Sequence, residues 1–231
     1  MVLTTQWSEI EQLQGRVAAD TWRWFIDRYR PFVSMALRRL IWSSDRSAEA
    51  IDHFCGYLFE GDLLGRVGRQ MRFRAFLIST LRNYAHDWMR RNPRVAAAPE
   101  DRRVDQGPFL PEDEEVALWA RQLLYLAMQR LEAEQPTWAS VVRSFYGLPR
   151  SPEAELAAPR RVTEVAAEMG CRANALHQVM YRARQRLREL LVIEVRQTVS
   201  GLRDLDSELE VLLSALGRVA PGVLAAPTQR S

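Results

Sequence analysis

The residues best suited to chemistry lie between positions 161 and 191, and the chemistry they suit is hydrogen bonding to nucleic acid. Base edges and phosphates can be contacted by Arg172, Asn174, His177, Gln178, Tyr181 and Arg182. Arg184 continues this series, and Arg186 and Arg188 follow at the same alternate spacing. These side chains predict a surface that contacts DNA, provided that one structural element presents them together.

A helix-turn-helix pattern predicts that element. Thr163 is expected to cap a short helix, Gly170 to make a left-handed turn, and a second helix to run from about Ala173 to Leu191. The apolar stripe of the second helix is expected at Leu176, Met180, Ala183 and Leu187. The N-terminal residues of such a helix enter the major groove. Any helical hairpin with a glycine turn would give the same spacing, so this alternative stays open.

A second candidate surface lies in residues 71–94, where aromatic residues and arginines share one predicted helix. The face expected to point to the core carries Phe73, Leu77, Leu81, Tyr84 and Trp88. The opposite face and the preceding loop are polar and mainly basic, with Arg69, Arg72, Arg82, Asn83, His86, Asp87 and Arg90. Such a face is either an ordinary solvated surface or a nucleic-acid contact, and composition alone does not decide between them.

The sequence gives little support for enzyme chemistry or metal binding. Cys55 and Cys171 lie far apart without a CxxC partner, so we expect two reduced thiols. The histidines at positions 53, 86 and 177 do not cluster with these cysteines. No nucleophile–base pair or phosphate-binding loop is evident. We therefore expect that the protein is not an enzyme and has no cofactor and no metal site.

Hydropathy predicts that the protein does not insert into a membrane. No stretch approaches the roughly 18 apolar residues of a membrane-spanning helix. Residues 1–12 lack the basic and apolar regions of a signal peptide. We expect a cytoplasmic protein.

Charge is distributed unevenly along the chain. All 32 basic residues are arginines and the net charge is +3, but residues 1–95 carry +5, residues 96–135 carry −5 and residues 136–198 carry +4. Residues 92–115 contain four prolines, carry −4 and lack an apolar period. This composition predicts a flexible acidic linker between two basic domains.

The periodic segments predict an all-α fold with two small helical domains. The first, over residues 1–94, opens with a short helix from Ser8 to Gly15 and a longer one over residues 19–42, kinked or interrupted at Pro31. We assign the linker to residues 95–115 and the second domain, with the helix-turn-helix, to residues 116–198. Residues 199–231 are expected to form a C-terminal helical tail whose end could be disordered.

Taken in order, these segments resemble the extracytoplasmic-function sigma factors of bacterial RNA polymerase. RFRAFLISTLRNYAHDWMRR resembles the sigma region 2 helix that binds and melts the −10 promoter element. FCGYLFEGDLL resembles the helix that binds core polymerase. VTEVAAEMGCRANALHQVMYRARQRLRELL resembles the region 4 helix-turn-helix that reads the −35 element. LVIEVRQTVSGLRDLDSELEVLLSAL resembles the tail of a planctomycete-like subgroup, so the resemblance covers residues 4 to 216.

The resemblance implies a protein that binds core RNA polymerase and directs promoter recognition and melting. Contacts to the −35 element would come from the residues between Arg172 and Arg184 named above, and contacts to the −10 element from the polar residues between Arg69 and Arg90. The loop from Leu63 to Arg72 would hold a flipped base of the non-template strand. Core polymerase would contact Glu49, Asp52, His53 and Leu58. An anti-sigma factor or another regulatory protein is a further expected partner.

The sequence departs from the family at one acidic run. Family members typically carry Asp-Ala-Glu-Asp where the helix that docks on polymerase begins, whereas this chain has Arg46-Ser47-Ala48-Glu49. One interpretation is drift, with affinity supplied by other contacts. The other is gating, with Ser47 as a regulatory site, because phosphorylation would add a charge of about −1.5 to −2 where acid is missing.

Two other functions stay open. The protein could be a repressor or architectural protein that binds DNA without polymerase, and co-purification with core polymerase would separate this from a sigma factor. It could also be an interaction module whose sigma-like surface binds only a regulator. A promoter-specific transcript made with core polymerase would argue against that module.

Overall fold

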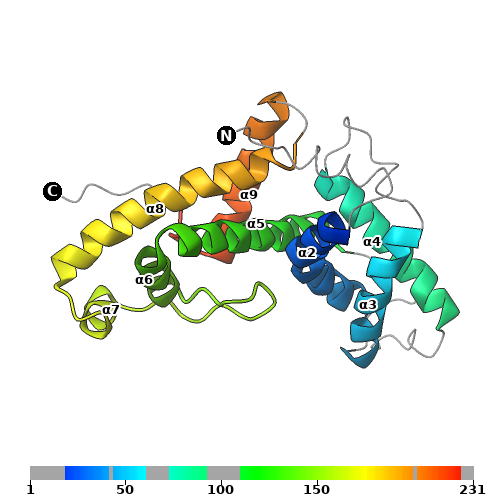
Figure 1. Cartoon of the computed structure of the whole chain (residues 1–231), viewed down its shortest axis with the longest axis horizontal. Helices are drawn as coiled ribbons and strands as arrows, with labels where there is room; N and C mark the ends of the chain where they lie inside the picture. The colour runs from blue at the N-terminus through cyan, green and yellow to red at the C-terminus, as the bar shows by residue number, and fades with distance from the viewer. Residues whose placement is uncertain (1–18, 42–43, 61–72, 93–109, 200–201, 225–231) are drawn as a thin grey trace. The chain divides into compact units, whose positions relative to one another are not determined.

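The computed structural model describes residues 19–41, 44–60, 73–92, 110–199 and 202–224. These residues form eight α-helices and no strand, so the all-α prediction is confirmed for them. Figure 1 draws these helices as coiled ribbons. The chain divides into two compact units: unit 1 comprises Met1–Trp119 and Arg196–Asp204, and unit 2 comprises Ala120–Val195 and Leu205–Ser231. The helix predicted from Ser8 to Gly15 lies outside the described residues.

Unit 1 is built on three helices that pack against one another: α2 (Ala19–Leu40), α3 (Ser44–Glu60) and α4 (Phe73–Arg91). Of the kink or interruption expected at Pro31, the interruption does not occur, because α2 runs through this residue. Burial on both sides explains the continuity: Phe25 and Tyr29 precede the proline in the core, and Phe32 follows it there. Packing of this one apolar stripe offsets the backbone hydrogen bond that proline cannot make.

The predicted core face of α4 is largely confirmed. Phe73, Leu77, Leu81 and Tyr84 are buried, and the Tyr84 hydroxyl donates a hydrogen bond of 2.9 Å to the Ala50 carbonyl of α3. Trp88 differs, because it is only half-buried at the edge of this face. Its ring packs beside the exposed His53, with 5.4 Å between ring centroids.

Helix α5 (Glu112–Glu134) begins inside the segment predicted as a linker. Trp119 is 0% exposed and lies in the core of unit 1, its ring stacked on Tyr29 at 6.2 Å and edge-on to Phe32 at 4.9 Å. Leu110 is also buried. The predicted linker is therefore wrong for residues 110–115, which are held by the burial of apolar residues on either side of the acidic run. Residues 95–109 lie outside the described part.

Unit 2 contains the remainder of α5 with α6 (Pro136–Tyr146), α7 (Val162–Glu168), α8 (Ala173–Arg196) and most of α9 (Leu202–Val219). Two ion pairs, Arg130 with Glu194 and Glu134 with Arg186, join α5 to α8. Because position numbers rise along one helix as they fall along the other, the helices are antiparallel. The segment after α9 is attached too, since the Tyr146 hydroxyl donates to the Gly222 carbonyl at 3.0 Å.

A loop over residues 147–160 connects α6 to α7 and depends on a glycine. Gly147 has φ +64°, and a Cβ built there would lie 2.2 Å from the Ala157 carbonyl oxygen. Two backbone hydrogen bonds of 2.9 Å close the loop, from Ala157 N–H to the Gly147 carbonyl and from Arg160 N–H to the Phe145 carbonyl. The loop thus returns the chain to the end of α6, where α7 begins and packs against α6.

Truncation of Trp119 tests whether the start of α5 belongs to the core of unit 1. Trp119→Ala should lower the free energy of unfolding by about 3–5 kcal/mol, because it empties a fully enclosed site. Leu213→Ala on α9, where the side chain is 46% exposed, serves as the control and should change stability by less than about 0.5 kcal/mol. Urea unfolding measures both, and equal small losses would show that the α5 start is only loosely attached.

Candidate nucleic-acid interface

The entrance to α8 is set by a tight turn after α7. Gly170 has φ +63°, a left-handed conformation that favours glycine, as predicted. The turn is closed by a hydrogen bond of 2.9 Å from Cys171 N–H to the Ala166 carbonyl. The predicted cap at Thr163 is wrong: Arg161 is the N-cap, and its N–H donates to the Glu164 carboxylate at 3.3 Å. The cap shifts because helical backbone geometry already begins at Val162.

Helix α8 has two sharply different faces. The predicted apolar stripe is confirmed and extends further, with Leu176, Met180, Ala183, Leu187, Leu190, Leu191 and Val195 all buried. The opposite face carries exposed polar side chains spaced three and four residues apart: Asn174, His177, Gln178, Tyr181 and Arg182. Burial of one face fixes the helix about its own axis. The five polar side chains therefore point to solvent together.

The charged side chains on the exposed face of α8 are all basic before Glu189. No Asp or Glu occurs between Glu168 and Glu189, whereas Arg172 and Arg182 are exposed in this interval. Tyr181 leaves 48% of its surface in solvent, a large exposure for an aromatic residue. A hydrogen-bonding, positively charged face with an exposed aromatic ring suits a polyanion that also has flat bases.

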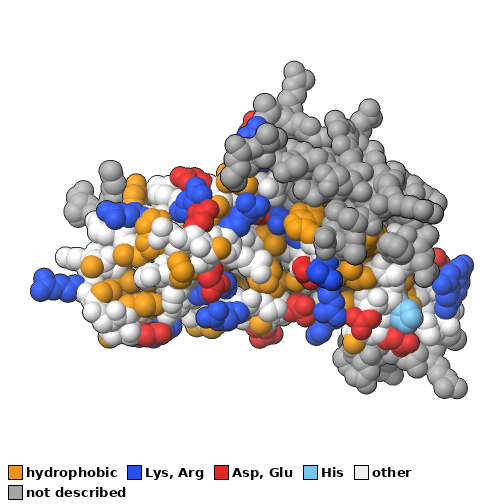
Figure 2. Space-filling view, viewed as in Figure 1, with side chains coloured by type: hydrophobic (Ala, Val, Ile, Leu, Met, Phe, Trp, Pro, Cys, Tyr) orange, Lys and Arg blue, Asp and Glu red, His pale blue; other side chains and the backbone are white. Residues whose placement is uncertain are grey.

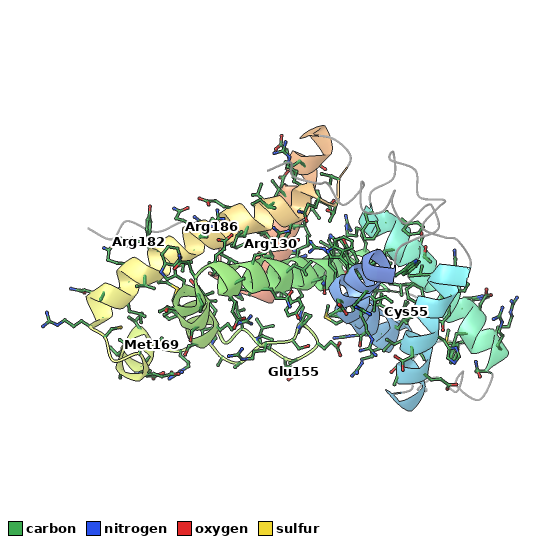
Figure 3. All side chains as sticks on the ribbon, in the orientation of Figure 1. Cys55, Arg130, Glu155, Met169, Arg182 and Arg186 are labelled. Atoms are coloured by element: carbon green, nitrogen blue, oxygen red, sulfur yellow. The ribbon has the colours of Figure 1, made fainter. Side chains whose placement is uncertain are left out.

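The later arginines of α8 are tied to the fold. Arg186 donates to both Glu134 oxygens, from Nε at 2.7 Å and from Nη2 at 2.9 Å, and also pairs with Glu189. Arg188 donates to the Leu224 carbonyl through Nε and Nη2. Arg184 is half-buried. Figure 3 labels Arg182 and Arg186 on successive turns of α8, and only the first of them is exposed. Contact of Arg186 or Arg188 with a DNA backbone would require these bonds to break.

Sequence reasoning did not single out Gln185, which lies one turn beyond Tyr181 and is half-buried. Its Nε2 lies 3.5 Å from the Tyr181 hydroxyl, so the two side chains meet on the polar face. The signal that could have found it is the spacing of four residues from Tyr181, which continues the series from Asn174.

The polar face of α4 is only partly as predicted. Asn83, His86 and Arg90 are exposed, and Asp87 is half-buried and pairs with Arg90 at 3.1 Å. Arg82 was expected to face DNA, but it forms an ion pair with Glu115 and donates to the Leu110 carbonyl at 2.9 Å. The start of α5, which helical periodicity could not place next to α4, supplies these acceptors. Arg69 and Arg72, like the predicted base pocket over residues 63–72, lie outside the described residues.

The residues expected to contact polymerase are divided between surface and core. Glu49, Asp52 and His53 are exposed on α3, and Asp52 pairs with Arg30 at 2.8 Å. Leu58 is 1% exposed and Ser47 is 2% exposed. Neither reaches the surface, because both lie on the face of α3 that packs into unit 1. Contact by Leu58 or phosphorylation of Ser47 would therefore require α3 to move from its place.

Burial disfavours the charged forms of one thiol and two phenols. Burial raises the pKa of the Cys55 thiol, so this cysteine is a poor nucleophile. Burial also raises the pKa of the Tyr84 and Tyr146 phenols. In contrast, the hydrogen bonds from Arg186 hold the pKa of Glu134 below its usual value.

Over the view in Figure 2, acidic and basic side chains are interspersed, so charge alone does not outline one patch there.

The Arg186–Glu134 pair gives a stability contribution that depends on pH. Arg186→Gln should lower the free energy of unfolding by about 0.2–1 kcal/mol at pH 7, as expected for an exposed pair. Glu134 has a lowered pKa when folded, so this contribution is present above its unfolded value of 4.5 and is lost as the pH falls through the folded value. Arg182→Gln removes the same charge from an exposed position and is the control. Chemical unfolding at pH 7 and pH 3 compares them, and a loss that persists unchanged at pH 3 would contradict the pairing.

None of the described helices is long and apolar enough to cross a membrane. Within the same described residues, no group of three His, Cys, Asp or Glu side chains is placed to hold a metal ion. No protein-family model, curated protein or solved structure matches the chain. Its function has to follow from its own residues and their geometry.

Proposed function

We propose that this protein is a sigma factor of the extracytoplasmic-function kind, which binds core RNA polymerase and directs it to promoter DNA. The single observation that carries the proposal is the exposed face of α8. Polar side chains that suit base edges, from Asn174 to Arg182, stand opposite a fully buried stripe and have no acidic neighbour within the helix until Glu189.

The entry end of α8 has the chemistry that reading of a major groove requires. Asparagine and glutamine can bond to adenine through two atoms, and arginine can do so to guanine. Asn174 and Gln178 offer these groups in the first turns of α8, and Arg172 lies immediately before the helix, after a tight turn. This supports the use of α7 and α8 as a helix-turn-helix, with α8 as its recognition helix.

Unit 1 supports the sigma assignment through the order of its features. An exposed polar face on α4, with Asn83, His86 and Arg90, precedes the recognition element, as in the resemblance to region 2. Exposed Glu49 and Asp52 on α3 offer acidic contacts to a basic polymerase surface. This support is weaker than that from α8, because Arg82 is engaged inside unit 1.

A DNA-binding regulator that does not support initiation is the second candidate, because the α8 face alone would serve it equally well. The two functions differ in polymerase binding. A protein-interaction module is disfavoured, because its surface would have no need for side chains suited to base edges.

Transcription with purified core polymerase tests the proposal directly. With a library of genomic fragments, the wild-type protein should yield transcripts whose 5′ ends share two upstream sequence elements. Core polymerase alone and polymerase with Arg172→Ala/Gln178→Ala protein are the controls, and neither should yield these ends. DNA binding without any such transcript would favour the regulator that does not initiate.

Substitutions on α8 should separate base contacts from phosphate contacts. Gln178→Ala or Asn174→Ala should relax preference at single base pairs, each costing about 1–3 kcal/mol at the preferred base. Arg182→Ala should weaken binding to all DNA sequences alike and reduce the salt dependence of binding by about one phosphate contact. Binding selections over randomised duplexes at two salt concentrations measure both effects. A uniform loss for every variant would rule out base recognition by this helix.

A further inference from the structure

The first turn of α5 covers two arginines of unit 1. Glu114 pairs with Arg39 of α2, with 2.8 Å between Oε1 and Nη1, and the next residue, Glu115, pairs with Arg82 of α4. Arg82 also donates to the Leu110 carbonyl. Figure 1 shows the N-terminal end of α5 beside α2 and α4. The two guanidinium groups therefore lie close enough to be bound by consecutive residues of one segment.

The acceptors that these arginines meet are of the kind that a nucleic-acid backbone would offer. Guanidinium groups bind carboxylates and phosphates with the same fork of N–H donors. Residues 112–115 are Glu-Asp-Glu-Glu, a run of four negative charges. Only the last two are used as partners of these arginines, whereas Glu112 and Asp113 are exposed. The segment thus places polyanion-like charge on Arg39 and Arg82.

The ion pair between Glu114 and Arg39 is more exposed than the pair between Glu115 and Arg82. Side-chain exposures are 59% for Arg39 and 29% for Glu114, and a pair as exposed as this contributes little to stability. The first turn of a helix is also where local opening is least costly. Trp119 lies one to two turns further along and remains anchored among Tyr29 and Phe32 when only the first turn opens. Opening of residues 110–115 would expose the buried Leu110 and Glu115 but would leave Trp119 and the core around it in place.

We propose that Arg39 and Arg82 form a binding site for the phosphate backbone of single-stranded DNA, and that residues 110–115 occupy this site in the free protein as an internal competitor. The proposal rests on the proposed function, in which exposed Asn83 and His86 of the same helix as Arg82 face the strand. Strand binding and closure of the first turn of α5 exclude each other. By linkage, a partner that holds the segment away raises the affinity for the strand.

The chain itself offers a matched pair of variants for the test. Glu114→Gln/Glu115→Gln weakens both contacts and keeps side-chain shape, whereas Glu112→Gln/Asp113→Asn removes the same two charges from exposed positions in the same turn. Binding of the full-length variants to a fluorescent 20-nucleotide single strand of mixed sequence is measured by anisotropy across a salt series. The first variant should bind at least about tenfold more tightly than the control variant. Its salt slope should steepen by about 1.4, since each phosphate contact on a single strand contributes about 0.7.

A third variant protects the test against loss of folding. Arg39 is exposed, so Arg39→Gln added to Glu114→Gln/Glu115→Gln should leave the thermal unfolding midpoint unchanged. It should also remove about half of the increase in salt slope. Equal strand affinity for the matched pair would overturn the proposal, because net charge would then explain any gain. An unchanged slope after Arg39→Gln would overturn it as well.

Run-off transcription with core polymerase separates this proposal from the proposed function. Transcripts from the wild type, together with equal strand binding by the matched pair, would rule out the internal competitor but support the role in initiation. A gain confined to Glu114→Gln/Glu115→Gln, with no transcript from any variant, would instead support the strand site and remove the sigma role.

Discussion

Leu176, Met180, Ala183 and Leu187 face inward along α8, and the rest of the candidate interface depends on their burial. A helix of this kind has one rotational position in which its apolar stripe is covered. Once that position is fixed, the side chains half a turn away must point to solvent. Two ion pairs with α5, made by Arg186 and Glu194, lie nearer its C-terminal end and hold the helix along its length. The exposed face is therefore a consequence of core packing.

The arginines of this chain divide into those that build the fold and those that remain on its surface. Arg82, Arg143 and Arg186 each bind a carboxylate within their own unit. Arg172, Arg182 and Arg90 are exposed. The sequence contains no signal that separates the two groups, because every basic residue is an arginine and net charge counts all alike. What separates them is whether an acceptor from another element lies within reach, and only the tertiary structure supplies that information.

The parts of the fold that could be predicted from sequence are those fixed by local periodicity. The core faces of α4 and α8 follow from apolar residues three and four positions apart, and Gly170 follows from the need for a left-handed residue between two helices. Leu58 and Ser47 follow the same rule. Both continue the spacing of Ile51 and Phe54, so periodicity places them in the core, where they are found. The resemblance to a family instead implies surface roles for both, because it carries roles over without regard to the face of the helix.

Residues 110–115 show why acidic, proline-containing composition did not reveal local structure. Four acids at the start of a helix are favoured by the partial positive charge of its N-terminus, just as four acids in a linker are favoured by solvation. The composition is the same in both situations. The difference comes from one buried apolar residue on each side of the acidic run, Leu110 before it and Trp119 after it. Their burial brings the acids within reach of Arg39 and Arg82. An acidic run next to a single well-spaced tryptophan is therefore better treated as the start of a packed helix than as the end of a tether.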